Sequence, residues 1–219
     1  VVSGISIGSA DFRRTSTNHT ILKNTIIMQG ITGIPFFNGI DLINVTDTSI
    51  DSNTIIMNVT GFTSNPSEFF RGIIIRRDST NINVTNLLIN GTEIAIPISY
   101  RGIMLSTAAN LINIKNITIF MNGTKTVPNN DAIAIGGVRN INIYQSTFFS
   151  KTTIIKINAT ISGGSVSNNN ITFINNTLNC LDNFNCIDIL VTGNSTDIFL
   201  INTLTFGNIT SSFLSFIAD

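Results

Sequence analysis

The sequence predicts an all-β fold, a right-handed parallel β-helix of about seven coils with about 30 residues in each. The first reason is composition: 41 Ile, 31 Asn and 28 Thr make up almost half of the 219 residues, and β-branched side chains favour strands. The second is an internal repeat. The third is that the apolar runs are short and are separated by Asn, Gly and Ser. Strands this short cannot bury a core alone, whereas stacked copies can.

Each repeat unit contains an apolar residue, a Thr or Asn four positions later, and further apolar residues. These Thr or Asn residues, called anchors below, are Thr25, Thr54, Asn86, Thr118, Thr147, Thr177 and Thr203. A second apolar run, often after Gly, occupies residues 39–43, 72–75, 102–105, 132–135, 154–157, 187–190 and 213–216. We therefore expect a β-helix over residues 18–219 and an N-terminal strand or cap segment over residues 1–17.

Sharp turns between the strands are expected at Asn. The residue before the anchor is Asn24, Asn53, Asn176 or Asn202 in four of the seven units. Asn tolerates left-handed backbone angles and can hydrogen-bond a stacked neighbour, so an internal asparagine ladder is predicted there. The alternative is that Asn is simply abundant throughout the chain.

The low charge of the chain excludes some classes of partner. Charged residues make up 11% of the sequence and the net charge is zero, whereas a nucleic-acid surface needs a clustered basic stripe. No apolar run approaches the roughly 18 to 20 residues of a membrane-spanning helix. We expect neither nucleic-acid binding nor a membrane span. The chain starts at Val1 without an initiator Met or signal peptide, so we expect a processed or trimmed start.

Acceptor motifs for N-glycosylation are unusually frequent. Random order would give about 31 × 28/219, or roughly four, Asn-x-Thr triplets, but the sequence contains twelve. Their asparagines are Asn18, Asn44, Asn58, Asn83, Asn90, Asn116, Asn122, Asn158, Asn170, Asn175, Asn194 and Asn208. The single Asn-x-Ser, at Asn65, is blocked by Pro66. Alternating strands of Ile, Asn and Thr would also generate such triplets, but not the threefold excess without the serine form. We expect a densely glycosylated chain at the cell surface or outside the cell.

The two cysteines, Cys180 and Cys186, enclose five residues. In an oxidising compartment they are expected to form a disulfide. A zinc site is the alternative, but with His19 as the only histidine it would have to recruit scattered Asp ligands. We expect no metal site and no cofactor.

Residues 140–148 (NINIYQSTF) and 170–177 (NITFINNT) resemble the degenerate repeats of the pectin-lyase-like superfamily of right-handed β-helices. The likeness covers about residues 18 to 217 and implies the fold. Because the motif is structural and recurs in unrelated β-helical proteins, it implies little about function.

Many members of that superfamily cleave acidic polysaccharides, so the resemblance raises an enzyme as an alternative. Polygalacturonase-like members carry Asn-Thr-Asp, Asp-Asp, Gly-His-Gly and Arg-x-Lys motifs that supply a general acid and a general base. Here residues 130–136 (NDAIAIG) match the Asp-Asp block with only Asp131 acidic. Gly-His-Gly and Arg-x-Lys are missing. We therefore expect no catalytic residues.

Lyase-like members instead use Asp ligands for calcium and an Arg or Lys base. Candidates by type are Arg71, Arg76, Arg77, Arg101, Asp41, Asp78 and Asp131. The competing interpretation is a set of solvated charges at coil edges, since calcium needs several converging carboxylates. The Phe pairs 36–37, 69–70 and 148–149 each combine an inward ring with one that could face outward, either to bind a sugar or to pack beneath a loop.

The remaining class is a structural protein. Solenoids need polar caps at their ends, and neither end of the sequence has one, so the chain is a fragment of a longer solenoid or its ends are covered by neighbouring subunits. We expect a homo-oligomer, a filament or lattice assembled end to end. The predicted contact residues are Val1, Val2, Ile5, Ile7, Phe213, Phe216 and Ile217. A polysaccharide-binding or polysaccharide-cleaving protein, or a fragment of a larger adhesin, is the alternative.

Overall fold

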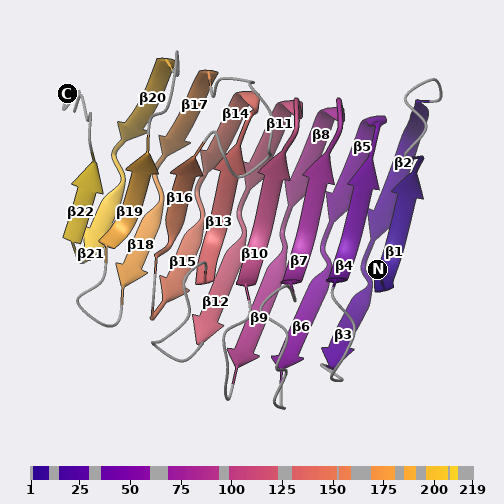
Figure 1. The fold of residues 1–219 in the computed structure, drawn as a ribbon, viewed down its shortest axis with the longest axis horizontal. Helices are drawn as coiled ribbons and strands as arrows, with labels where there is room; N and C mark the ends of the chain where they lie inside the picture. Colours follow the sequence, from indigo (N-terminus) through magenta and orange to yellow (C-terminus); the bar gives the residue numbers. More distant parts are fainter. Residues whose placement is uncertain are drawn as a thin grey trace.

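The fold is a parallel β-solenoid, seen in a computed structural model that describes residues 2–9, 15–29, 36–59, 69–93, 99–122, 130–151, 153–158, 169–180, 185–190, 196–206 and 208–211. Three parallel sheets, named A, B and C, contain eight, seven and seven strands. Each strand pairs with the strands three before and three after it in the sequence, so the sheets run side by side along the long axis (Figure 1). No described residue is helical. The expectation of an all-β solenoid is confirmed.

Sheet A contains the second apolar run of most repeat units. Its strands are β1 (Val2–Gly8), β4 (Phe36–Ile43), β7 (Phe69–Arg76), β10 (Ser99–Ser106), β13 (Asn130–Gly136), β16 (Ile155–Asn158), β19 (Asn185–Leu190) and β22 (Asn208–Ser211). The predicted run 213–216 lies outside the described residues. β1 lies within the segment 1–17 and forms the first strand of this sheet, in register with β4.

The first apolar run of each unit divides into two strands, one in sheet B and one in sheet C. Sheet B consists of β2 (Ser16–Leu22), β5 (Val45–Asp51), β8 (Thr80–Thr85), β11 (Asn110–Lys115), β14 (Arg139–Tyr144), β17 (Asn169–Ile174) and β20 (Thr196–Ile201). Sheet C consists of β3 (Thr25–Gln29), β6 (Thr54–Val59), β9 (Leu88–Glu93), β12 (Thr118–Asn122), β15 (Thr147–Ser150), β18 (Thr177–Cys180) and β21 (Leu204–Phe206). The sequence showed two runs per unit because only a short corner separates β2 from β3.

Residues in left-handed conformation make these corners. The corner between sheets B and C has φ near +50° at Lys23, Ser52, Asn86, Asn116, Gln145, Asn175 and Asn202. A residue in the left-handed conformation turns the chain sharply, and Asn adopts that conformation at a lower energetic cost than most other residues. A second series, just inside the sheet B strands, comprises Asn18, Asp47, Asn81, Leu111, Asn140, Asn170 and Asp197. The abundance of Asn is thus partly a requirement of the corners.

The register of sheet C corrects two of the predicted anchors. Thr25, Thr54, Thr118, Thr147 and Thr177 pair in one outward column, but Leu88 and Leu204 occupy the places expected for Asn86 and Thr203. Asn86 is instead a left-handed corner residue. Matching by residue type therefore shifted the repeat by two positions in one unit and by one in another.

The predicted internal ladder forms in part. Asn53 Oδ1 accepts hydrogen bonds from the backbone N–H of Asn24 at 2.9 Å and from Asn24 Nδ2 at 3.0 Å. Asn176 Oδ1 accepts from the backbone N–H of Ser146 at 3.0 Å. Leu87 and Ile117 interrupt the series with buried apolar side chains. Asn202 is not a member, since it occupies the exposed corner position and Thr203 follows it.

The core lies inside the three sheets, where columns of like residues stack along the axis. In sheet A, fully buried isoleucines follow one another at positions 40, 73, 103, 133, 155 and 187. Tyr100 is also fully buried, and its hydroxyl donates to the backbone carbonyl of Met57 at 2.7 Å. Its ring fills the space beside Gly91, where an added Cβ would lie 2.5 Å from the Tyr100 hydroxyl.

Candidate functional site

Most sequon asparagines face the surface. The structure describes the side chains of nine of the twelve, and seven are exposed: Asn18, Asn83, Asn90, Asn116, Asn122, Asn170 and Asn175. Asn58 is half-buried. The side chains of Asn158, Asn194 and Asn208 lie outside the described residues. For these eight of nine, the predicted outward orientation is confirmed, and an amide nitrogen on the surface is what an attached sugar requires.

Asn44 is the exception to this orientation. Its side chain is only 6% exposed, its φ is +53°, and its Oδ1 accepts a hydrogen bond from the Thr15 hydroxyl at 3.4 Å. The turn between sheets A and B draws this side chain inward. A sugar on its Nδ2 would have to displace that packing.

Corner geometry explains why some sequons carry Asn, but not why they carry Thr. Five sequon asparagines have positive φ: Asn18, Asn44, Asn116, Asn170 and Asn175. A corner residue needs only to tolerate the left-handed region. The other described sequons, including Asn83 and Asn90, lie within strands and have no such constraint. Corner geometry therefore accounts for five of the eleven sequon asparagines whose backbone the structure describes.

The expected stacked row of Asn58, Asn90 and Asn122 is wrong in one member. Asn58 and Asn122 each pair with Thr92, whereas Asn90 pairs with Ile56 on one side and Phe120 on the other. The cause is the anchor at Leu88 rather than Asn86. Asn90 therefore lies one column away, among apolar side chains.

The outer surface carries rows of hydrogen-bonded asparagine side chains that were not predicted from the sequence. Asn142 Nδ2 donates to Asn113 Oδ1 at 3.1 Å, and Asn113 Nδ2 donates to Asn83 Oδ1 at 3.2 Å. Asn116 Nδ2 donates to Asn86 at 2.7 Å, and Asn170 Nδ2 to Asn140 at 2.8 Å. Each amide has two N–H groups, so a sugar on Asn116 or Asn170 leaves one for the ladder. The recurrence of Asn at a spacing of about thirty residues is the sequence signal that could have predicted these rows.

The outer face of sheet A carries a second candidate site, a row of charged side chains. Asn38, Arg71, Arg101 and Asp131 pair in one column, and Asp41 lies in the next. All five are buried, with at most 8% exposure. Ile74 and Met104 on the same face are buried as well, although they lie outside the contiguous core. These charges are therefore not the solvated coil-edge charges of the simpler interpretation.

Two ion pairs neutralise most of this charge. Arg76 Nη2 donates to Asp41 Oδ2 at 2.9 Å, and Arg101 Nε donates to Asp131 Oδ2 at 3.2 Å. Asn38 Nδ2 donates to Asp41 Oδ2 at 3.1 Å. The Arg101–Asp131 pair is buried on both sides and Arg76 is half-buried, so separating either pair would leave a buried carboxylate without a partner.

No acidic side chain among the described residues forms a hydrogen bond or an ion pair with Arg71. Its Nη1 donates to Asn38 Oδ1 at 3.4 Å, its guanidinium lies 4.8 Å from the Phe69 ring centre, and its buried Nε has no hydrogen-bond partner. Burial, together with the charges of Arg101 and Arg76, lowers the pKa of Arg71 to about 10, while the charge of Asp41 opposes this fall. Stacking on the outward ring of Phe69 compensates part of this cost.

Asp131, the one carboxyl in a place that matches the polygalacturonase-like pattern, is 1% exposed. Burial raises its pKa, while Arg101 and Lys156 oppose that rise. Asp188 raises the pKa as well, so a second carboxyl does stand nearby, which the sequence motif did not indicate. Nevertheless, Arg101 occupies Asp131 Oδ2 directly. Among the described residues no group of three or more His, Cys, Asp or Glu side chains could hold a metal ion.

The phenylalanine pairs divide as expected into inward and outward rings. Phe37 and Phe70 stack inside with centroids 4.6 Å apart, and Phe36 and Phe69 stack outside at 5.4 Å. Phe149 faces outward and stacks on Phe120 of the preceding strand in sheet C.

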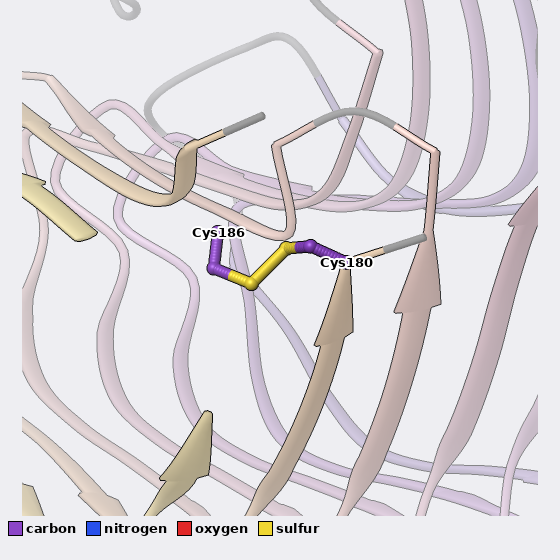
Figure 2. The surroundings of a disulfide bond; sticks show 2 residues. All are labelled: Cys180 and Cys186. Carbon is purple, nitrogen blue, oxygen red and sulfur yellow. A yellow bond between two sulfur atoms is a disulfide. The ribbon is translucent and has the colours of Figure 1, made fainter. Parts of the chain in front are cut away.

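The predicted disulfide is present. Cys180 at the end of β18 and Cys186 in β19 are bonded, with Cα atoms 5.6 Å apart (Figure 2). The bond ties sheet C to sheet A across the short connection between them. A disulfide is compatible with an oxidising location.

The predicted assembly residues are only partly described. Val2 lies in β1, whose described partner is β4 alone, and Ile5 and Ile7 are half-buried against the core. At the opposite end, Ile198 and Leu200 are half-buried in the same way. Val1, Phe213, Phe216 and Ile217 lie outside the described residues.

Within the described ranges no helix is long and apolar enough to cross a membrane.

Comparisons with family models, curated proteins and solved structures did not place the chain in a family. No family model, no curated protein and no solved structure matches the chain.

Proposed function

We propose that the chain is a non-enzymatic, heavily N-glycosylated extracellular structural protein, a subunit of a cell-surface filament or lattice assembled end to end. The observation that carries the proposal is the threefold excess of sequons, of which eight of the nine described side chains reach the surface. A weakly charged β-rich surface tends to associate. Bulky hydrophilic sugars along the sides would prevent lateral association.

The proposal also takes the solenoid as a right-handed β-helix of about seven coils, like the pectin-lyase-like proteins. Sheets of seven or eight strands and pairing between every third strand support this count. Asp188 stands near Asp131, but Arg101 donates directly to Asp131 Oδ2, and this contact supports a protein without polysaccharide-cleaving activity.

End-to-end contact would use the two terminal turns. Interior members of the isoleucine column of sheet A are fully buried, whereas Ile5 is half-buried at the end of the stack. A neighbouring copy would cover such residues and complete the hydrogen bonds of the edge strands. Burying about 300 Å² of apolar surface would contribute about 7 kcal/mol before the entropic cost of association. All described strand pairings are parallel, so a contact between opposite ends is head to tail, and such a contact gives an open filament when its rotation does not close a ring.

Two measurements on the secreted protein test this function. Glycopeptide mapping is expected to find sugars on most exposed sequons, and Asn44 is expected to be bare because its side chain is buried. Electron microscopy is expected to show rods longer than one molecule. Bare asparagines throughout, or a protein that stays monomeric at high concentration, would refute the proposal.

A polysaccharide-binding protein is the second candidate. The observation in its favour is Arg71, whose buried Nε has no hydrogen-bond partner among the described residues and whose guanidinium lies against the outward rings of Phe36 and Phe69. Calorimetric titration with a polyuronate, repeated with R71Q, separates the two candidates. Binding that R71Q abolishes supports the second candidate, and no heat of binding supports the first.

A further inference from the structure

The outer face of sheet C contains an apolar column broken by one sequon. Ile27, Ile56, Asn90, Phe120 and Phe149 follow one another as paired residues on five successive strands. Ile27 is 60% exposed and Phe120 is 39% exposed. Asn90 is exposed too. Exposed apolar rows of this kind usually mark a surface that something covers.

The ring of Phe120 is stacked on one side only among the described rings. Phe149, on the next strand, lies parallel to it, with centroids 4.5 Å apart and planes within 5°. The opposite face of the Phe120 ring is therefore turned toward the preceding strand. The residue paired with Phe120 on that strand is Asn90, about 4.8 Å away along the axis.

We propose that the first sugar of a glycan on Asn90 packs against the free face of Phe120 and covers the apolar column of sheet C. This inference rests on the N-glycosylation proposed above. A pyranose ring presents a face of C–H groups, and the face of an aromatic ring carries partial negative charge that attracts them. The sugar would extend the stack that Phe149 and Phe120 begin, with Ile56 on its other side.

Asn122 provides a natural comparison within the same sheet. It is an exposed sequon asparagine, but its paired residue on the preceding strand is Thr92. The described partner of Asn122 is therefore polar, whereas Asn90 pairs with Phe120 on the following strand and with Ile56 on the preceding one. The two sites differ in this contact while sharing the sheet.

The test compares thermal unfolding midpoints of the glycosylated, secreted protein in two backgrounds, with Phe120 and with F120T. Removing the Asn90 sequon by N90Q, or by T92A, is expected to lower the midpoint by about 2 to 4 °C when Phe120 is present, the size of shift a single favourable contact gives in a chain of 150–250 residues. In F120T the same change is expected to shift the midpoint by less than about 1 °C. N122Q is expected to have the same effect in both backgrounds.

A second readout does not depend on the variants. Protons of the innermost sugar on Asn90 are expected to show upfield ring-current shifts in the NMR spectrum, and those on Asn122 are not. Equal midpoint shifts in both backgrounds with no upfield signals would overturn the inference. Peptide mapping that finds Asn90 bare while other sequons carry sugars would overturn it and leave the proposed function intact. If all sequons are bare, both fail.

Discussion

Replacing Gly102 with alanine is expected to destabilise the solenoid because glycines stack in one column of sheet A. Gly4, Gly39, Gly72 and Gly102 follow one another just before the isoleucine column, whose members Ile40, Ile73 and Ile103 are fully buried and whose end member Ile5 is half-buried. A Cβ built on Gly102 would lie 2.6 Å from the carbonyl oxygen of Ala132 and 2.8 Å from Ile119 Cγ2. The first neighbour is backbone in a paired strand, so it cannot move without disturbing the sheet.

The size of the effect follows from these two contacts. Inserting one methyl group into a well-packed interior usually costs about 1–3 kcal/mol, and we expect the upper half of that range because a backbone atom is involved. In a chain of this length each 1 kcal/mol lowers the unfolding midpoint by about 2–4 °C. G102A is therefore expected to lower the midpoint by about 4–12 °C.

Differential scanning calorimetry and urea unfolding of G102A measure this loss. Ala132 occupies the next place in the column and already carries a methyl group, so A132G is the matched control. A132G is expected to cost only about 0.5–1 kcal/mol, the penalty for glycine in a strand. A G102A protein as stable as the wild type would show that the glycine column is not set by close packing.

Three further predictions concern the charged face and the disulfide. R71M is expected to leave the free energy of unfolding at neutral pH unchanged or raised, because it removes a buried cation that has no acidic hydrogen-bond partner. R101M is expected to cost about 3–5 kcal/mol, because it leaves the buried Asp131 without its partner. Urea unfolding of both variants measures the difference, and equal losses of stability would contradict this reasoning. Since burial raises the pKa of Asp131 above its usual value of 3.8, the folded state binds its proton more tightly, so this group's contribution to stability falls as the pH rises from about 4 through the raised pKa. D131N is expected to remove that decline from the pH profile of the urea midpoint, and an unchanged profile would contradict the assignment. Replacing Cys180 and Cys186 together by serine is expected to cost about 2 kcal/mol, the closure entropy of so short a loop, and reduction of the wild type should give the same loss by calorimetry.

Much of the fold could be predicted because its signals are local. Strand propensity comes from Ile and Thr, and the glycines before the second run reflect the close approach of neighbouring backbones at Gly39 and Gly72. The disulfide followed from the short spacing of its cysteines. The two misplaced anchors show the limit of such reasoning, because Asn86 has the residue type of an anchor but the backbone angles of a corner.

The candidate sites were less predictable because they depend on which strands lie side by side. Nothing near Asn90 in the sequence indicates Phe120, thirty residues later, as its neighbour. The pairing of Arg101 with Asp131 likewise joins adjacent strands. Asn44 resembles every other sequon until the turn that follows β4 draws its side chain inward.

The sequence by itself determined that this chain forms stacked strands with a repeat near thirty residues, carries an excess of sequons and joins its two cysteines. Alternation within a strand is enough to decide which side chains point inward. Only the tertiary structure decided which column each residue joins. The reason is that every left-handed corner resets the alternation, so a difference of one or two residues in a turn moves all following side chains to a different neighbour. The surroundings of Asn90, Arg71 and Asn44 are consequences of those corners.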